Sequence, residues 1–508
     1  MSVTPSLDEF RATYDAGRAQ LVWTRTVADL ETPVAAMLKL ADGRPNSFLL
    51  ESVEGGAIRG RYSFIGLKPD LIWRCRGDRA EVNRRALSDP EAFEPCEGGA
   101  LDSLRALIAE CRIPDFPGSL PPMAASLVGY MGYDMVRLME RLPNMPPDPV
   151  GIPDGMFLRP TVMLVFDTIE DQITIVTPVW PRPGVSAATA YEDAVERVSD
   201  VLGDLERSLP HRGPAVDVGE LPPPRSNMTR AQFEAVVEKA RDYIAAGDAF
   251  QIVPSQRFSI PFALPPFALY RALRRLNPSP FLFFLDFGGF AIVGSSPEIL
   301  VRVRDDKVTI RPLAGTRRRG RDAAEDRMLA QELLSDPKEI AEHLMLLDLA
   351  RNDVGRVSRI GSVRVVEQFE IEYYSHVMHI SSEVQGDLDP RYDAISALIA
   401  GFPAGTVSGA PKVRAMEIID ELEPEKRGIY AGCIGYFAGN GTMDTCIGLR
   451  TGLVKDGTLY VQAGVGVVAD SNPAAEYQES IDKAKALVRA AEEAVRFAAR
   501  QGARNERH

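Results

Sequence analysis

The residues best suited to chemistry in this chain are two pairs of glutamates, each close to the start of an expected helix. The two stretches are Asp336-Pro337-Lys338-Glu339-Ile340-Ala341-Glu342-His343 and Asn472-Pro473-Ala474-Ala475-Glu476-Tyr477-Gln478-Glu479. In both, Asp or Asn suits the helix cap and proline suits the first helical position. A spacing of three residues places both carboxylates of a pair on one helix face. Two such faces turned toward each other would form a pocket for a hard cation such as Mg²⁺, which indicates a metal-assisted enzyme acting on an anionic substrate.

Each glutamate pair on its own has a second interpretation. Glutamates are common on exposed helix faces, and Glu339 stands where the acid of a capping box belongs. The choice between a solvated helix face and a metal pocket therefore depends on the residues around the pairs.

Several short motifs in the downstream half accompany the glutamates. In chain order they are Gly247-Asp248-Ala249-Phe250-Gln251, Ser295-Ser296-Pro297-Glu298, Pro312-Leu313-Ala314-Gly315-Thr316, Asp348-Leu349-Ala350-Arg351-Asn352-Asp353, His379, Gly405-Thr406-Val407-Ser408-Gly409-Ala410-Pro411-Lys412, Arg450 and Gly464-Val465-Gly466-Val467-Val468-Ala469-Asp470-Ser471. Each motif alone is weak evidence. In this order and spacing they resemble the chorismate-utilising enzymes, and within that family the large subunits of anthranilate synthases. The resemblance covers nearly the whole chain.

The resemblance implies a site for Mg²⁺ and for chorismate, a small dianion. Glu342 and Glu479 match the metal ligands, and Glu339 and Glu476 would orient ligands and waters behind them. The residues that match substrate-binding positions are Gly315, Thr316, Tyr430, Arg450, Gly464, Val465, Gly466 and Lys483. Arginine suits forked pairing with a carboxylate, and glycine turns can present backbone N–H groups to an anion. Taken singly, each residue equally fits a structural role. The arginine fits a structural ion pair, the tyrosine a core position, the glycines a hairpin turn and the lysine an exposed surface.

The resemblance also implies four catalytic positions. Glu298 matches the acid that protonates a leaving hydroxyl, and its pKa is expected to be raised in a closed pocket beside acidic groups. His379 matches the histidine assigned to pyruvate elimination, and Thr406 lies in the matching loop. Gln251 is neutral and cannot activate water, which favours ammonia as the nucleophile. From the residues alone, Glu298 also fits a polar residue at the start of a strand, and His379 also fits a structural histidine.

Two further positions distinguish members of this family. The 4-amino-4-deoxychorismate synthases carry a nucleophilic lysine where this chain has Ala314. The family often has alanine where this chain has Val465, so valine is expected to add bulk beside the substrate.

The implied reaction converts chorismate and ammonia to anthranilate and pyruvate, the first committed step of tryptophan biosynthesis. No glutaminase motif surrounds Cys433, so ammonia is expected from a separate glutamine amidotransferase subunit. The rival enzymes are a 2-amino-2-deoxyisochorismate synthase, which would stop before pyruvate elimination, and a component of a 4-amino-4-deoxychorismate synthase. A rival of another class is an inactive tryptophan-binding regulatory paralogue, which the intact set of candidate catalytic residues disfavours.

The resemblance further implies feedback inhibition by tryptophan. The matching residues are Leu50, Glu51, Ser52, Pro280, Phe281, Leu282, Gly435 and Tyr436. Glu51 would bind the ammonium group of the ligand and Ser52 its polar atoms. The family commonly has Tyr-Met where Phe281-Leu282 stand, so one hydroxyl is missing. From the residues alone, a strand end packed on a neighbouring domain explains this segment equally well.

Bulk composition limits the partners and the location. The 508 residues carry a formal net charge of −13, which argues against nucleic acid as a partner. The run Arg317-Arg318-Arg319-Gly320-Arg321 favours a solvated loop or a small-anion site instead. Five scattered cysteines fit a reducing cytoplasm. No signal peptide is expected at the N-terminus, and no apolar stretch is long enough to span a membrane.

The elements that must position these residues alternate strands and helices. Expected strands are 47–50, 62–66, 71–75, 162–166, 173–176, 250–258, 290–294, 300–304, 308–311, 432–437 and 459–461, and expected helices are 101–110, 187–209, 229–247, 322–335, 337–349, 411–421 and 473–499. The expected class is α/β of the α+β type, with large, mostly antiparallel sheets flanked by helices, as in chorismate-utilising enzymes.

A proline-rich stretch divides the chain into expected domains. Residues 1–210 would form an N-terminal regulatory domain with part of the tryptophan site, and 211–227 the linker. Residues 228–500 would form the chorismate-binding catalytic domain, followed by a polar tail at 501–508.

Overall fold

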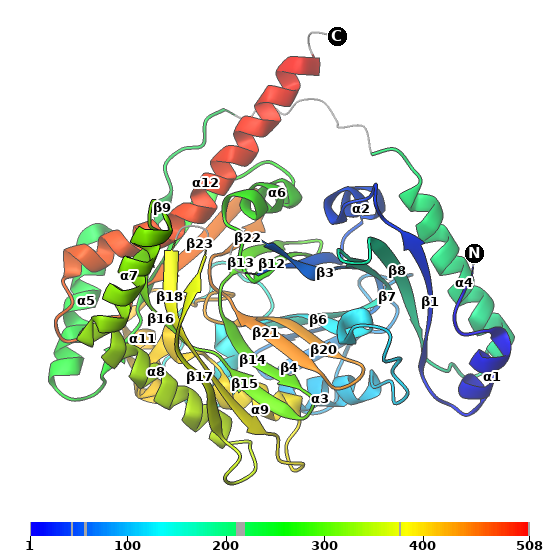
Figure 1. The fold of residues 1–508 in the computed structure, drawn as a ribbon, viewed down its shortest axis with the longest axis horizontal. Coiled ribbons are helices and arrows are strands. Elements are labelled where there is room, and N and C mark those ends of the chain that lie inside the picture. Colours follow the sequence, from blue (N-terminus) through cyan, green and yellow to red (C-terminus); the bar gives the residue numbers. More distant parts are fainter. Residues whose placement is uncertain (1, 42–43, 55–57, 210–218, 375–376, 506–508) are drawn as a thin grey trace.

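The computed structural model describes residues 2–41, 44–54, 58–209, 219–374 and 377–505. Within these residues the strands pair antiparallel and helices flank the sheets (Figure 1), which confirms the expected fold class. The largest sheet joins twenty-one strands, and β10 and β19 form a separate pair.

The helices and strands have the following bounds. The helices are α1 Leu7–Asp15, α2 Pro33–Leu40, α3 Ala100–Glu110, α4 Ala187–Leu205, α5 Arg230–Ala245, α6 Pro266–Leu276, α7 Ala323–Ser335, α8 Pro337–Gly355, α9 Ala394–Gly401, α10 Gly405–Ser408, α11 Lys412–Leu422 and α12 Pro473–Asn505, with short 3₁₀ helices at Pro122–Ala124 and Tyr133–Leu138. The upstream strands are β1 Gln20–Val27, β2 Ser47–Glu54, β3 Ile58–Arg76, β4 Arg79–Asn83, β5 Phe93–Pro95, β6 Ser126–Met131, β7 Gly155–Asp167, β8 Gln172–Val179 and β9 Arg225–Ser226. The downstream strands are β10 Gln251–Ile252, β11 Ser255–Pro261, β12 Phe281–Asp286, β13 Ala291–Ser296, β14 Ile299–Arg304, β15 Lys307–Ile310, β16 Leu313–Arg318, β17 Arg364–Tyr373, β18 Val377–Asp387, β19 Gly409–Ala410, β20 Cys433–Ala438, β21 Met443–Ile447, β22 Thr451–Lys455 and β23 Thr458–Gly464.

Strands from the two halves of the chain are hydrogen-bonded to each other. β2 pairs with β12, with Glu51 opposite Leu282, and β6 pairs with β20, with Val128 opposite Tyr436. The halves therefore share backbone ladders in addition to side-chain contacts. The expected division at 211–227 stays a prediction, and residues 211–218 of it lie outside the described part of the chain.

Helices cover the sheets through extensive apolar packing. One core gathers α2, α4, α6 and α12 through Leu40, Val198, Leu269 and Leu487. α6 and α12 lie side by side, and the C-terminal end of α12 extends beyond the sheets (Figure 1). A second core holds the helices around the candidate catalytic region, with Leu347 of α8 and Leu398 of α9 almost fully buried. These cores fix α8 and α12, the two helices that carry the glutamate pairs.

The starts of α8 and α12 follow the expected capping chemistry. The Asp336 carboxylate accepts the N–H of Lys338 at 3.0 Å, and Pro337 occupies the first helical position. The Asn472 side chain accepts the N–H of Ala475 at 3.1 Å. Both glutamate pairs are therefore positioned by locally determined helix starts.

Two expectations about elements were wrong in detail, and some elements were missed. The strand expected at 250–258 is two strands in different sheets, because Pro254 lacks the N–H that a continuous ladder needs. The helix α6 was not anticipated. The last helix, expected to end at residue 499, continues to Asn505, so residues 501–505 of the expected polar tail are helical and 506–508 lie outside the described residues. Among the described helices, none is long and apolar enough to cross a membrane.

Candidate active site

Glu298 lies in the tight turn between β13 and β14, where its carboxyl group is buried. The residue is 5% exposed. Its Oε1 accepts the backbone N–H of Leu313 at 3.4 Å, and its Oε2 accepts the Thr406 hydroxyl at 3.3 Å. Burial raises the pKa of Glu298 to about 8, outweighing the opposing effects of these bonds and of Arg450. At neutral pH this residue is a protonated carboxylic acid that can donate a proton.

Arg450 places a positive charge near this acid. Its backbone has φ of 47°, in the left-handed region, directly before β22. Burial lowers the pKa of its guanidinium, and Tyr374 and Glu298 are the groups that oppose this effect. Within the described residues Arg450 makes no ion pair with a carboxylate. A buried guanidinium without a carboxylate partner among the described residues is suited to hold the carboxylate of a ligand.

His379 lies on β18 and is neutral. Its Nδ1 is 2.9 Å from the carbonyl oxygen of Gly315 and 3.1 Å from the Thr316 hydroxyl. Burial and then Arg450 lower the pKa of the imidazole to about 4. Because a carbonyl can only accept, Nδ1 carries the proton and Nε2 carries the lone pair. The histidine can therefore act as a base through Nε2.

Gly315 shapes the backbone beside this histidine. Pairing between β16 and β18 shifts by one residue between Ala314 and Thr316, and Gly315 there has φ of +69°. A side chain at this position would lie 3.0 Å from the Glu339 carboxylate and 3.1 Å from Leu333. The bulge turns the glycine carbonyl toward the imidazole, so both Gly315 and Thr316 orient the histidine.

Gln251 is held beside the first glutamate face. The side chain is 3% exposed, and its Nε2 donates to Oε1 of Glu342 at 3.0 Å. A Cβ on Gly466 would lie 2.7 Å from that Nε2 and 3.9 Å from Glu342, so glycine leaves room for both groups. Burial raises the pKa of Glu342, with Glu339 adding to the effect.

The two glutamate faces share one electrostatic environment. Burial raises the pKa of Glu476, as it does that of Glu342, and Lys338 and Lys483 act on both carboxylates. The structure therefore brings α8 and α12 together at this point. The other glutamate of each pair forms an ion pair at 2.8 Å, Glu339 with Arg317 and Glu479 with Lys483. Across the described ranges, no group of three or more His, Cys, Asp or Glu side chains converges as a ready-made metal site.

The glycine segment 464–466, which the sequence predicted as a turn, is an extended continuation of β23 and adjoins Tyr430. A Cβ on Gly464 would lie 2.5 Å from the Tyr430 hydroxyl, and the Gly464 carbonyl accepts Lys483 Nζ at 3.1 Å. Tyr430 is 6% exposed, and burial raises its pKa to about 12. Val465 is fully buried in a core cluster with Ile252. The expectation that this valine adds bulk beside a ligand stays a prediction.

The arginine run at 317–321 is neutralised within the chain. Arg317 pairs with Glu332, Asp336 and Glu339; Arg318 and Arg321 pair with Glu325; Arg319 pairs with Asp326. The run therefore attaches α7 and the start of α8 to β16, which the sequence did not indicate. These pairs disfavour a small-anion site, whereas the exposed side chains of Arg318 and Arg321 agree with solvation of this segment.

The eight residues expected to bind tryptophan line one cavity between β2, β12 and β20. Its wall also includes Pro297 and Ile299, the two neighbours of Glu298. Glu51 is already engaged: it accepts two hydrogen bonds from Arg274, one of them at 2.7 Å, and one from Tyr270 at 2.5 Å. A ligand ammonium would therefore have to share this carboxylate with α6.

Tyr374 is a site residue that sequence reasoning missed. Its ring meets His379 edge-on with centroids 5.4 Å apart, and its hydroxyl donates to Glu372 at 2.7 Å. Burial strongly raises its pKa. No local signal marks this tyrosine, since it follows an ordinary strand and reaches the histidine only through the pairing of β17 with β18.

Comparisons with known proteins agree with this geometry. A family model described as chorismate binding enzyme matches residues 75–489. The anthranilate synthase component 1 of Cereibacter sphaeroides is 60% identical over 500 residues, covering 98% of this chain and 99% of the relative. That of Pseudomonas aeruginosa is 50% identical over 477 residues, covering 92% and 94%.

Solved structures show the same architecture. The crystal structure of anthranilate synthase component I from Streptococcus pneumoniae matches with a TM-score of 0.74 at 39% identity, covering 84% of this chain and 92% of that chain. The menaquinone-specific isochorismate synthase MenF of Escherichia coli matches with a TM-score of 0.69 at 20% identity, covering 93% and 94%, and supports the fold alone.

Proposed function

The chain belongs to the chorismate-binding enzymes, and from this premise we propose that it converts chorismate and ammonia to anthranilate and pyruvate, as component I of an anthranilate synthase. The observation that carries the proposal is the grouping of a protonated Glu298, a neutral His379 and an Arg450 that pairs with no carboxylate among the described residues. These three groups supply a proton donor, an anion-binding cation and a base, and Arg450 acts electrostatically on both of the others. This is what a reaction that expels a hydroxyl from a dianion and then loses a proton requires.

Binding comes first. The planar guanidinium of Arg450 offers forked hydrogen bonds to one carboxylate of chorismate. Beside the Val465 N–H, which donates to the Pro254 carbonyl, the backbone N–H of Gly466 can serve an anionic oxygen nearby. Lys483 lies at the same glycine segment and adds positive charge.

Amination follows. Glu298 donates its proton to the departing ring hydroxyl, which leaves as water while ammonia bonds to the ring. Gln251 is a neutral amide engaged by Glu342 and cannot deprotonate water, so the nucleophile must be reactive without a base. Ala314 rules out a lysine nucleophile at its position. Ammonia satisfies both conditions.

Elimination completes the reaction. The Nε2 lone pair of His379 accepts the proton from the ring carbon that bears the new amine, and the neighbouring ring C–O bond breaks. The leaving group is enolpyruvate, which takes up a proton on its methylene carbon to give pyruvate. Thr316 and Gly315 hold Nδ1 and so fix the tautomer. The aromatic product makes this step strongly favourable.

We propose that Mg²⁺ binds between the two glutamate faces. The available donors are oxygens, which suit a hard cation. Burial raises the pKa values of Glu342 and Glu476 more than Lys338 and Lys483 lower them, so a bound cation would stabilise the ionised carboxylates. Glu342 and Glu479 would hold the ion with Glu339 and Glu476 behind them. When bound, Mg²⁺ would supply positive charge for the ring carboxylate of chorismate.

Glu342→Gln is expected to lower turnover by more than about 100-fold, since loss of an outer metal partner alone costs roughly 10–100-fold, while the fold is retained. Glutamine can keep the bond to Gln251 but lacks the negative charge. Turnover as a function of Mg²⁺ concentration, with calorimetric titration of Mg²⁺ in the presence of chorismate, provides the measurement. Glu493→Gln, on the same helix as Glu479 but paired with Arg275, is the control. Normal turnover and normal Mg²⁺ dependence in Glu342→Gln would remove the metal assignment.

We further propose that tryptophan inhibits the enzyme at the cavity between β2, β12 and β20. Glu51→Gln is expected to weaken inhibition by roughly tenfold or more, since hydrogen bonds to charged groups contribute about 1.5–3 kcal/mol, while anthranilate formation without tryptophan is retained. Inhibition curves and calorimetric titration with tryptophan measure the effect. Asp305→Asn, an exposed acid on the same cavity, should change neither value. Unchanged inhibition in Glu51→Gln would refute the site. A lysine at position 51 is a poorer test, because it would face Arg274.

The direct test of the function is an assay of the purified chain with chorismate, ammonium and Mg²⁺, followed by anthranilate fluorescence and pyruvate release. Consumption of chorismate without fluorescence would indicate a 2-amino-2-deoxyisochorismate synthase. Tryptophan binding with no consumption of chorismate would indicate an inactive regulatory paralogue. Ammonia in the cell would come from a separate glutamine amidotransferase subunit, and addition of that subunit should allow glutamine to replace ammonium.

A further inference from the structure

A buried arginine that the sequence did not single out joins separate segments of the active site. Arg427 lies between α11 and β20, and its side chain is 1% exposed. Its Nε donates to Glu423 Oε2 at 2.9 Å, and its Nη2 donates to Glu423 Oε1 at 2.6 Å. The remaining donors reach two backbone carbonyls, those of Val407 at 2.7 Å and Val253 at 2.6 Å.

Both carbonyls belong to segments that carry candidate catalytic residues. Val407 follows Thr406, whose hydroxyl donates to Glu298. Val253 comes two residues after Gln251 and donates its own N–H to the Ser408 carbonyl at 3.1 Å. The guanidinium therefore fixes the α10 segment relative to the β10 segment.

The same guanidinium also contacts two aromatic rings, one of which belongs to the segment of Tyr430. Arg427 lies 5.4 Å from the ring centroid of Tyr430 and 4.9 Å from that of Tyr133. The Tyr430 N–H donates to the Arg427 carbonyl at 3.3 Å. On the opposite side, Glu423 accepts the N–H and hydroxyl of Ser255 at 2.7 and 2.9 Å, which connects the network to β11.

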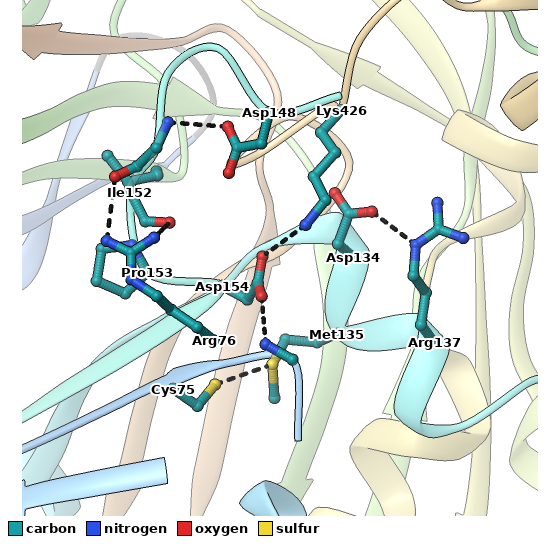
Figure 2. Close-up of polar contacts among 12 residues, drawn as sticks. Cys75, Arg76, Asp134, Met135, Arg137, Asp148, Ile152, Pro153, Asp154 and Lys426 are labelled. Carbon is teal, nitrogen blue, oxygen red and sulfur yellow. Dashed lines mark hydrogen bonds and ion pairs between the residues drawn. The ribbon is translucent and has the colours of Figure 1, made fainter. Parts of the chain in front are cut away.

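The arginine itself is anchored through its neighbours. Lys426 forms an ion pair with Asp154 at 3.5 Å, and Figure 2 shows this contact beside the bond between Asp134 and Arg137. The Gly428 carbonyl accepts the N–H of Tyr133 at 2.8 Å. The segment 426–428 is therefore tied to the upstream half of the chain.

We propose that Arg427 is a positioning residue of the reaction, which holds the Thr406, Gln251 and Tyr430 segments in register without touching the substrate. The inference rests on the proposed function. A planar guanidinium can serve one carboxylate and two carbonyls at once, whereas an ammonium group cannot reproduce this fork. Loss of the fork leaves buried carbonyls unsatisfied and allows the three segments to shift relative to one another.

The test is Arg427→Lys, which keeps the charge and removes the fork. We expect a folded protein whose kcat for anthranilate formation falls roughly 10–100-fold, since a displacement of about 1 Å at a site can cost 100-fold. KM for chorismate should change little, because Arg450 is unaltered. The loss of kcat at alkaline pH should move to higher pH, because the Thr406 hydroxyl no longer stabilises the Glu298 carboxylate. A structural role alone would not shift the pH profile.

Arg137→Lys is the matched control. Arg137 is partly buried, with a side chain 14% exposed, pairs with Asp420 and Asp134 at 2.8 Å and donates to the Asn144 carbonyl at 2.6 Å, yet none of its partners belongs to the candidate site. This variant should lose thermal stability and keep kcat and the pH profile.

Three results would contradict either the positioning role of Arg427 or the proposed function. Unchanged kcat and pH profile in Arg427→Lys, or the same losses in Arg137→Lys, would overturn the positioning role while the proposed function stands. If Arg427→Lys does not fold, Glu423→Gln replaces it, with a smaller fall in kcat and the same direction of pH shift expected; unchanged kinetics there would also overturn the role. A wild-type chain that forms no anthranilate would refute the proposed function, and this inference with it.

Discussion

Replacing Glu298 by glutamine lowers kcat for anthranilate formation by roughly 10²–10⁴-fold, the range expected when a general acid is lost. Glutamine has nearly the same shape and can still accept the Leu313 N–H, so the fold is retained. It has no acidic proton for the departing hydroxyl. Steady-state kinetics with chorismate and ammonium, beside thermal unfolding of both proteins, provide the measurement. A variant with normal kcat would show that another group protonates the hydroxyl.

The pH dependence of the same variant gives an independent check. The wild-type kcat should fall above about pH 8, where Glu298 loses its proton, and the residual activity of Glu298→Gln should lack this fall. The free energy of unfolding should depend on the same proton of Glu298. Between the ordinary value of 4.5 and about 8, the folded chain holds a proton that the unfolded chain has lost. The free energy of unfolding should therefore decrease as pH rises through this window, and decrease less in the variant.

Asp286→Asn is the control for these measurements. Burial raises the pKa of Asp286 as well, and its carboxylate accepts the N–H of Gly288 at the end of β12. Its replacement should leave kcat and the alkaline fall in activity unchanged. A similar loss in both variants would mean that buried acids matter here only for folding.

Arg450→Gln is expected to lower kcat/KM for chorismate by about 30- to 5000-fold, since loss of one partner of a buried charge pair costs about 2–5 kcal/mol. The effect should fall mainly on KM, because the guanidinium binds a carboxylate that the substrate keeps throughout the reaction. Arg450→Lys, which keeps the charge without the fork, should recover part of the loss.

Thermal unfolding distinguishes binding from a structural role for Arg450. In the described part of the chain this guanidinium has no carboxylate partner, and burial disfavours its charge. The glutamine variant should therefore be at least as stable as the wild type, as expected where a site is maintained at the expense of stability. A clear fall in the unfolding temperature together with the lost activity would instead indicate a structural ion pair.

Part of the site could be predicted from local sequence. Asp336-Pro337 and Asn472-Pro473 begin helices as expected, because capping depends on residues only a few positions apart. The close approach of Gln251 to Glu342 and of Thr406 to Glu298 agrees with the expected site. These residues were assigned through motifs, since none of their contacts is local in sequence.

Other features could not be predicted, and each involves partners distant in the chain. Val465 faces the core because β10 and α5 pack against it. Pro254 divides an expected strand because its two sides pair with different strands. The ion pair between Glu51 and Arg274 depends on where α6 packs, and the sequence did not predict α6.

The sequence by itself determined which chemical groups the proposed site offers. They are its carboxyl groups, its histidine, its arginine and its glycines, each identified from residue type and motif. The tertiary structure alone decided which of these charges are compensated. Glu298 and Arg450 keep groups that a ligand can use, whereas Glu339, Glu479 and Glu51 are engaged by cations of the chain. Charge compensation depends on distances of a few ångströms between residues that are mostly far apart in sequence, and burial sets the strength of each interaction. Only the packed chain defines both quantities.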